Sequence, residues 1–205
     1  MVKVHTKYFE YGDKEISYLS QADPILGNAM ERLGKLERVV IPDLFQALIF
    51  AIIGQQISAK AANTVFERFE ESLEEISPNN ISMLSKEEIQ QFGVTLRKAG
   101  YIKAMAESVS KGDLELQGLY ELSDIAVVEK LCKIKGIGVW TSEMLLLNSM
   151  ERPDIVSFGD IAIRRGMMKL YDLKELTRDQ FNEYKGRYSP YGSTASIYLW
   201  RLSFE

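Results

Sequence analysis

Residues 131–160 read LCKIKGIGVWTSEMLLLNSMERPDIVSFGD, and this stretch decides the expected fold. Two runs with apolar residues at helical spacing are separated by a Gly-Ile-Gly turn, and Asp160 stands just before a third such run. Gly136 and Gly138 allow positive φ, so the turn can bring its backbone close to another molecule. Free N–H groups at the start of the next helix favour an anion. The stretch therefore predicts two helices joined by a turn suited to a phosphate.

Composition narrows the classes of protein that this chain can belong to. Its 205 residues, 46% of them hydrophobic, suffice for one domain or for two small lobes sharing a core. A single cysteine, Cys132, excludes an internal disulfide and a multi-thiolate metal cluster, and a single histidine, His5, argues against a His-based triad or zinc site. No apolar run approaches the roughly 18 residues of a membrane helix, and no signal peptide is recognisable at the N-terminus. We expect a soluble intracellular protein.

Helical spacing covers most of the chain, and strand character is confined to residues 8–19, where we expect a small β-hairpin at most. The sequence predicts an all-α fold with two lobes in a single unit over residues 1–205: lobe A over 43–113, and lobe B over 1–42 plus 114–205. The expected helices are 23–34, 43–56, 58–73, 85–93, 95–113, 122–134, 139–150, 159–171, 177–187 and 191–204.

Further motifs make the pattern specific. The turn fits L-x-x-I-x-G-I-G-x-x-[TS], and it is accompanied by LFQALIFAIIGQQISAKAA (44–62), GVTLRKAGYIKAMA (93–106), GDIAIRRG (159–166) and SPYGSTASIYLWRL (189–202). With these stretches the chain resembles the helix-hairpin-helix DNA glycosylase superfamily, closest to the 3-methyladenine DNA glycosylase II type, over roughly residues 40–204. The resemblance implies a two-lobed helical fold that binds double-stranded DNA containing damaged bases.

The same resemblance assigns roles to individual residues. Asp160 is the expected catalytic carboxylate, because breaking an N-glycosidic bond places positive charge on the sugar and a fixed negative charge stabilises it. The base pocket is expected to include Trp140, Trp200, Met144 and Gln55. Gln56 and Ile57 are the candidate minor-groove wedge. Lys135, Gly136, Gly138 and Thr141 are expected to hold a DNA phosphate, with a monovalent cation, Na⁺ or K⁺, at the backbone of Lys133, Lys135 and Gly138.

Departures from the family pattern bear on the reaction. Trp140 stands where bifunctional relatives carry the lysine that forms a Schiff base, so the resemblance implies a monofunctional enzyme that hydrolyses the bond and leaves an abasic site. No cysteine quartet is present for an iron–sulfur cluster, and we expect no cofactor apart from the hairpin cation. Phe158 replaces a proline that is common two residues before the aspartate, and Gly192 stands where arginine is common.

Each assignment has a simpler structural alternative. Asp160 could act only as a helix N-cap, Trp140 and Trp200 could be core residues, and residues 54–58 could be an ordinary turn between helices. The reading predicts excision of alkylated purines of the 3-methyladenine and 7-methylguanine type. Its alternatives are a non-catalytic hairpin module that binds DNA, and a glycosylase for a deaminated or oxidised base. We expect a monomer without membrane contact, in the cytoplasm with the nucleoid of a bacterium or in the nucleus of a eukaryote.

Overall fold

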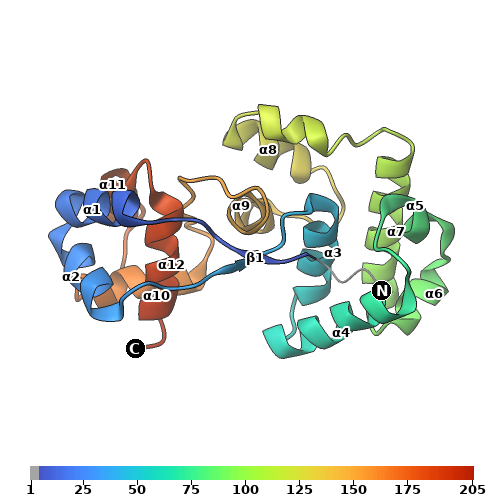
Figure 1. Ribbon diagram of the computed structural model, residues 1–205, viewed down its shortest axis with the longest axis horizontal. Helices are drawn as coiled ribbons and strands as arrows, with labels where there is room; N and C mark the ends of the chain where they lie inside the picture. Colours follow the sequence, from blue (N-terminus) through green and yellow to red (C-terminus); the bar gives the residue numbers. More distant parts are fainter. Residues whose placement is uncertain (1–4) are drawn as a thin grey trace. The chain divides into compact units, whose positions relative to one another are not determined.

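The structure is a computed structural model that describes residues 5–205 and divides into two compact units. The first unit comprises residues 5–7 and 41–150, and the second comprises residues 8–40 and 151–205. Figure 1 labels their helices and strands. Residues 114–150, which the sequence analysis assigned to lobe B, lie in the first unit with 43–113. The reason is packing, since the helix that follows the Gly turn contacts the apolar helix beginning at Leu44.

The first unit is entirely helical between residues 41 and 150. Its elements are α3 (Leu44–Gly54), α4 (Ala59–Ser72), α5 (Pro78–Met83), α6 (Lys86–Gln91), α7 (Leu96–Ser110), the 3₁₀ helix η1 (Gln117–Glu121), α8 (Asp124–Leu131) and α9 (Val139–Asn148). The short elements α5 and η1 were not expected from the sequence. The other helices confirm the predicted ones, with ends displaced by one to three residues.

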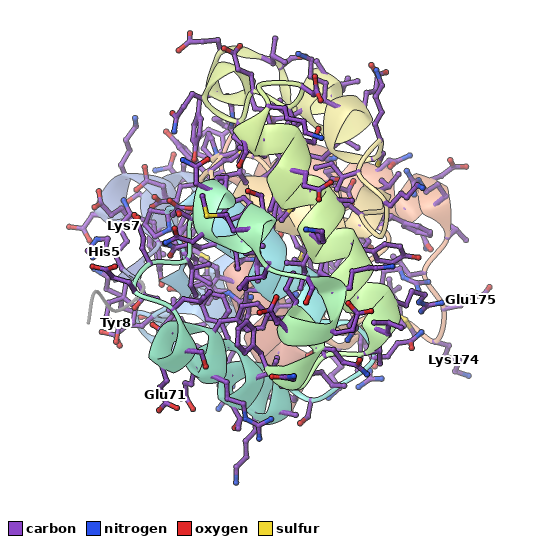
Figure 2. All side chains as sticks on the ribbon, turned by 90° about the vertical axis from the view of Figure 1, so that its right-hand side faces the viewer. His5, Lys7, Tyr8, Glu71, Lys174 and Glu175 are labelled. Atoms are coloured by element: carbon purple, nitrogen blue, oxygen red, sulfur yellow. The ribbon has the colours of Figure 1, made fainter. Side chains whose placement is uncertain are left out.

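The helix α3 forms the centre of the first unit. Leu48, Ile49, Ile52 and Ile53 are completely buried, which agrees with a helix that is apolar nearly all round. It packs against α4, α7 and α9, so the segment that follows it is held by elements distant in sequence. Acidic side chains lie on the outer surface of α4, and Glu71 points outward in Figure 2.

The second unit contains α1 (Asp13–Ala22), α2 (Pro24–Leu33), β2 (Val39–Val40), α10 (Ile161–Leu170), α11 (Arg178–Tyr188) and α12 (Gly192–Leu202). The expected hairpin over residues 8–19 is wrong, because residues 13–22 form α1. The helix is started by Gly12, whose N–H donates to the Glu15 carboxylate at 2.8 Å, and it buries Leu19. The strand β1 (Lys7–Tyr8) pairs instead with β2, from well beyond the expected turn.

Close packing of α10 on α12 forms the core of the second unit. A Cβ added at Gly166 of α10 would lie 2.0 Å from the carbonyl oxygen of Leu199, so only glycine allows the two backbones to meet here. Asp23, almost fully buried, caps α2 and accepts a hydrogen bond from Tyr171 at 2.6 Å. These contacts fix the start of α10, where Asp160 lies.

No helix within residues 5–205 is long and apolar enough to cross a membrane.

Candidate functional site

The turn between α8 and α9 is built around one glycine with positive φ. Gly136 has φ +91°, and a Cβ there would lie 2.6 Å from a ring carbon of Tyr101 on α7. Gly138 has φ −105° and caps α9, and a Cβ on it would meet nothing within 4 Å. The expectation of positive φ is therefore confirmed for Gly136 and wrong for Gly138. Gly138 is open on its outer side, so a bulky ligand could approach its backbone closely.

The predicted phosphate residues differ in exposure. Lys135, Gly136 and Gly138 are exposed, whereas the side chain of Thr141 is buried in the first turn of α9. Ile137 is buried and anchors the turn on its inner side. The exposed backbone of the turn and the N-terminus of α9 thus form the surface on which an anion can bind.

The carbonyl groups proposed to hold a cation are not equivalent. The Gly138 oxygen accepts the N–H of Ser142 at 2.9 Å and its hydroxyl at 3.0 Å, so it does not fit a cation ligand. The carbonyl oxygens of Lys133 and Lys135 accept no hydrogen bond within residues 5–205. Over the same residues no cluster of three or more His, Cys, Asp or Glu side chains could hold a metal ion.

The segment after α3 carries the predicted wedge residues on an exposed loop. Gln56 and Ile57 are exposed, Ile57 at 42%, and Gln56 has φ +60°, a conformation that a non-glycine residue adopts only when its surroundings enforce it. Ser58 then caps α4 by accepting the N–H of Ala61. The loop therefore presents two side chains to solvent from a strained backbone.

Two hydrogen-bonding groups fix this loop. The Gln55 side-chain amide donates to the Gly136 carbonyl at 2.6 Å, which joins the loop to the Gly turn. The Lys98 ammonium donates to the carbonyls of Ile53 at 2.8 Å and Gln55 at 2.7 Å. Burial lowers the pKa of Lys98, and the charge of Arg97 lowers it further. Both Lys98 and Tyr101 belong to α7, so this helix positions the loop and the turn together.

Trp140 and Met144 lie four residues apart on α9 and share one face of it. Trp140 is 48% exposed, and Met144 is half-buried. The alternative that Trp140 is a core residue does not hold in the first unit, because a core tryptophan would be far less accessible.

Asp160 in the second unit is the N-cap of α10. It is 7% exposed, and its Oδ1 accepts the N–H groups of Ala162 at 2.8 Å and Ile163 at 3.0 Å. The simple cap geometry is thus confirmed. It also leaves a buried carboxylate rigidly oriented at the positive end of a helix, as a preorganised electrostatic group requires.

Trp200 on α12 is half-buried and carries an arginine on its ring. The Arg38 guanidinium carbon lies 4.2 Å from the ring centroid, and the backbone carbonyl of Arg38 accepts the N–H of Phe9 at 2.8 Å. Burial lowers the pKa of Arg38, and the nearby charge of Asp160 opposes this shift. Arg38, Trp200 and Asp160 therefore form one cluster in the second unit. No sequence motif indicated Arg38 or Lys98, since each acts through a contact distant along the chain.

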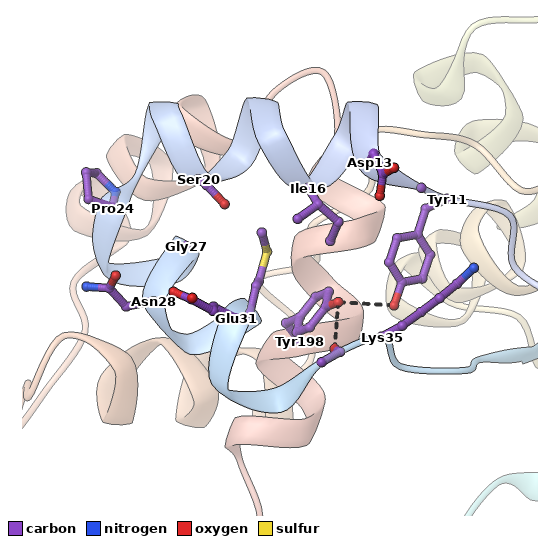
Figure 3. Close-up of a pocket in the computed structure, with 13 residues that line it drawn as sticks. Tyr11, Asp13, Ile16, Ser20, Pro24, Gly27, Asn28, Glu31, Lys35 and Tyr198 are labelled. Carbon is purple, nitrogen blue, oxygen red and sulfur yellow. Dashed lines mark hydrogen bonds between the residues drawn. The ribbon is translucent and has the colours of Figure 1, made fainter.

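A separate cavity of about 520 Å³ lies in the second unit between α1 and α2. Figure 3 shows it with Tyr11 hydrogen-bonded to Tyr198, which in turn donates to the Gly34 carbonyl. None of the residues predicted for the site lines this cavity.

Known proteins share both the sequence pattern and the fold. Residues 49–187, more than half of the chain, match the HhH-GPD superfamily of base excision DNA repair proteins. The chain belongs to this superfamily. DNA-3-methyladenine glycosylase 1 of Schizosaccharomyces pombe is 33% identical over 78% of this chain and 72% of its own length.

Two solved structures of superfamily members extend the comparison. The DNA-3-methyladenine glycosidase of Bacillus halodurans superposes with a TM-score of 0.84 at 32% identity, covering 96% of this chain and 92% of that one. The Schizosaccharomyces pombe 3-methyladenine DNA glycosylase Mag1, in complex with abasic DNA, gives a TM-score of 0.80 at 29% identity, covering 92% and 95%. The predicted all-α glycosylase fold is confirmed.

Proposed function

We propose that this superfamily member is a monofunctional DNA glycosylase, which flips alkylated purines of the 3-methyladenine and 7-methylguanine type out of double-stranded DNA and excises them by hydrolysis. The names of its relatives and the structure of Mag1 with abasic DNA support the activity and the DNA partner. One observation carries the proposal for this chain, namely the buried, doubly hydrogen-bonded carboxylate of Asp160.

Asp160 would act on the sugar of the flipped nucleotide. As the N-glycosidic bond breaks, positive charge grows on the sugar, and a carboxylate that is already oriented stabilises it without reorganisation. The same group can orient the attacking water or take its proton. Two backbone N–H groups hold Oδ1, so the carboxylate does not need to order itself during the reaction.

The indole rings of Trp140 and Trp200 are assigned to contacts with the base. Methylation at adenine N3 or guanine N7 makes the base cationic, and an electron-rich aromatic face attracts a cation. Met144 would complete these contacts. The Gln55 amide already donates to the turn, so we assign it to fixing the wedge loop. Gln56 and Ile57 would fill the space that the flipped base leaves.

Trp140 also determines the course of the reaction after the bond breaks. Indole cannot form a Schiff base, so water is the nucleophile and the strand stays intact at an abasic site. DNA itself would be held through the exposed backbone of the turn, which contacts phosphate without reading sequence. A cation at the turn would have only the carbonyls of Lys133 and Lys135 available, since that of Gly138 is engaged.

The proposal is tested by base release from a panel of duplexes that each carry one lesion. We expect release of 3-methyladenine and 7-methylguanine by the wild-type protein, and none by Asp160→Asn. Exclusive release of a deaminated or oxidised base would assign a different lesion. Binding without release from any duplex would leave the non-catalytic DNA-binding module. Borohydride trapping in the same reactions should give no covalent adduct, and an adduct would reveal an amine nucleophile.

A further inference from the structure

We propose that Phe158, Arg164 and Arg178 form a binding site for one DNA backbone phosphate beside Asp160; this site rests on the proposed function. It is separate from the Gly turn, because all three residues belong to the second unit. The observations behind it are the geometry of the two guanidinium groups, their lack of ionic partners and their position relative to the catalytic carboxylate.

Two arginines converge on a single aromatic ring. The guanidinium carbon of Arg178 lies 4.3 Å from the ring centroid of Phe158, and that of Arg164 lies 5.0 Å from the same centroid. Phe158 is held edge-to-face against the buried ring of Phe181, with 5.0 Å between centroids. The ring is therefore a supported platform that keeps two long, otherwise mobile side chains in place.

Both positive charges lack a compensating carboxylate. Within residues 5–205 neither Arg164 nor Arg178 forms an ion pair, and the buried Nε of Arg164 has no hydrogen-bond partner. Other arginines of the same unit are paired, as Arg187 is with Glu183 and Asp23. Two guanidinium groups held together on an uncharged ring repel one another, and a shared anion relieves this repulsion. Their planar forks suit the oxygen atoms of a phosphate.

The position of the cluster indicates which phosphate it takes. Phe158 precedes Asp160 by two residues, and Arg164 follows it by four, one turn along the same face of α10. A phosphate on this cluster would thus belong to the strand whose sugar faces Asp160. The phenylalanine that replaces the proline common in the family is then explained as the platform. Because the net charge is −4, binding to DNA must depend on such local clusters.

The test combines charge-neutral phosphates with arginine variants. Duplexes carry a stable abasic-site analogue, and each neighbouring phosphate is replaced in turn by an uncharged methylphosphonate. For the wild type, one replacement should weaken binding by about tenfold, the scale of one base-independent ionic contact. Arg178→Ala and Arg164→Ala should weaken binding to the unmodified duplex similarly and lose the effect of that one replacement. The salt dependence of binding should fall by about 0.9 per phosphate lost.

Matched variants separate the site from general charge and from folding. Arg165→Ala removes an exposed charge on the same helix that touches no ring, and it should keep the full effect of the neutral phosphate. Phe158→Leu keeps both charges but removes the platform, and it should weaken binding to an intermediate degree. Thermal unfolding of every variant establishes that it is folded.

The outcomes are distinct. If the wild type neither binds the duplex nor releases a base, the proposed function fails. If it does both, but Arg164→Ala and Arg178→Ala remain as sensitive to the neutral phosphate as the wild type, the site is refuted while the function stands. Competition by inorganic phosphate at the arginine cluster without any methylphosphonate effect would show a site for free anions and overturn the assignment to DNA.

Discussion

Replacing Asp160 with asparagine should abolish base excision while the protein stays folded. The amide oxygen can accept the same two backbone N–H groups that the carboxylate now binds at 2.8 and 3.0 Å. Asparagine caps helices about as well as aspartate, so the cap itself is kept. The loss of the charge at the N-terminus of α10 should cost about 0.3–1 kcal/mol of the free energy of unfolding.

The effect on the reaction is much larger than the effect on folding. Removing one preorganised electrostatic group typically lowers kcat by about 10²–10³-fold, equivalent to roughly 2.7–4 kcal/mol of transition-state stabilisation. Asp160→Ala removes both the charge and the cap, and should cost a further 0.5–2 kcal/mol or so of stability. The two variants should therefore be equally inactive and differ in the free energy of unfolding.

Single-turnover base release from a duplex with one 7-methylguanine measures the rate, and denaturant unfolding measures the stability of both variants. DNA affinity is measured in parallel with an abasic-site analogue and should change little for Asp160→Asn. The reasoning is refuted if Asp160→Asn releases the base at a near wild-type rate, because Asp160 would then be only a helix cap.

Three further substitutions address the elements around the carboxylate. Gly138→Val should leave the unfolding temperature unchanged and weaken binding to several unrelated duplexes by a similar factor in gel-shift titrations; a loss confined to one sequence would contradict a backbone contact. Lys98→Met should lower the free energy of unfolding by about 1–3 kcal/mol in urea and slow base release, because the carbonyls of Ile53 and Gln55 lose their donor; wild-type stability would show that the contact is unimportant. Arg38→Met should raise the rate of release of cationic 7-methylguanine relative to neutral hypoxanthine, because a positive charge is removed from the Trp200 face; an unchanged ratio would exclude this electrostatic role.

The helical architecture could be predicted because apolar spacing and Ser or Thr caps agree along most of the chain. The caps Ser58, Ser85 and Thr95 each accept a backbone N–H at the helix starts that the sequence suggested. The N-terminal segment failed because aromatic residues mimicked strand periodicity. Tyr18 lies on the exposed surface of a helix that is set by Gly12 and Glu15.

Site residues within local motifs were found, and those that act across the fold were missed. Asp160 and the Gly turn stand at fixed offsets from helix boundaries, so the pattern locates them. Lys98 reaches carbonyls more than forty residues away, and Arg38 reaches Trp200 from a loop, so neither leaves a signal in the sequence. Gly192 shows the same limit. A Cβ there would lie 2.7 Å from Oδ1 of Asp154, and that contact alone explains why glycine replaces the usual arginine.

The central claim is hydrolytic excision of an alkylated purine, and one reaction tests it most directly. The wild-type protein is incubated with a duplex that carries a single 7-methylguanine on a labelled strand, and mass spectrometry identifies the products before and after hot alkali. The account predicts free 7-methylguanine and an intact strand with an abasic site, which breaks only after alkali. Failure to release the base, or a strand already cut before alkali, would contradict it.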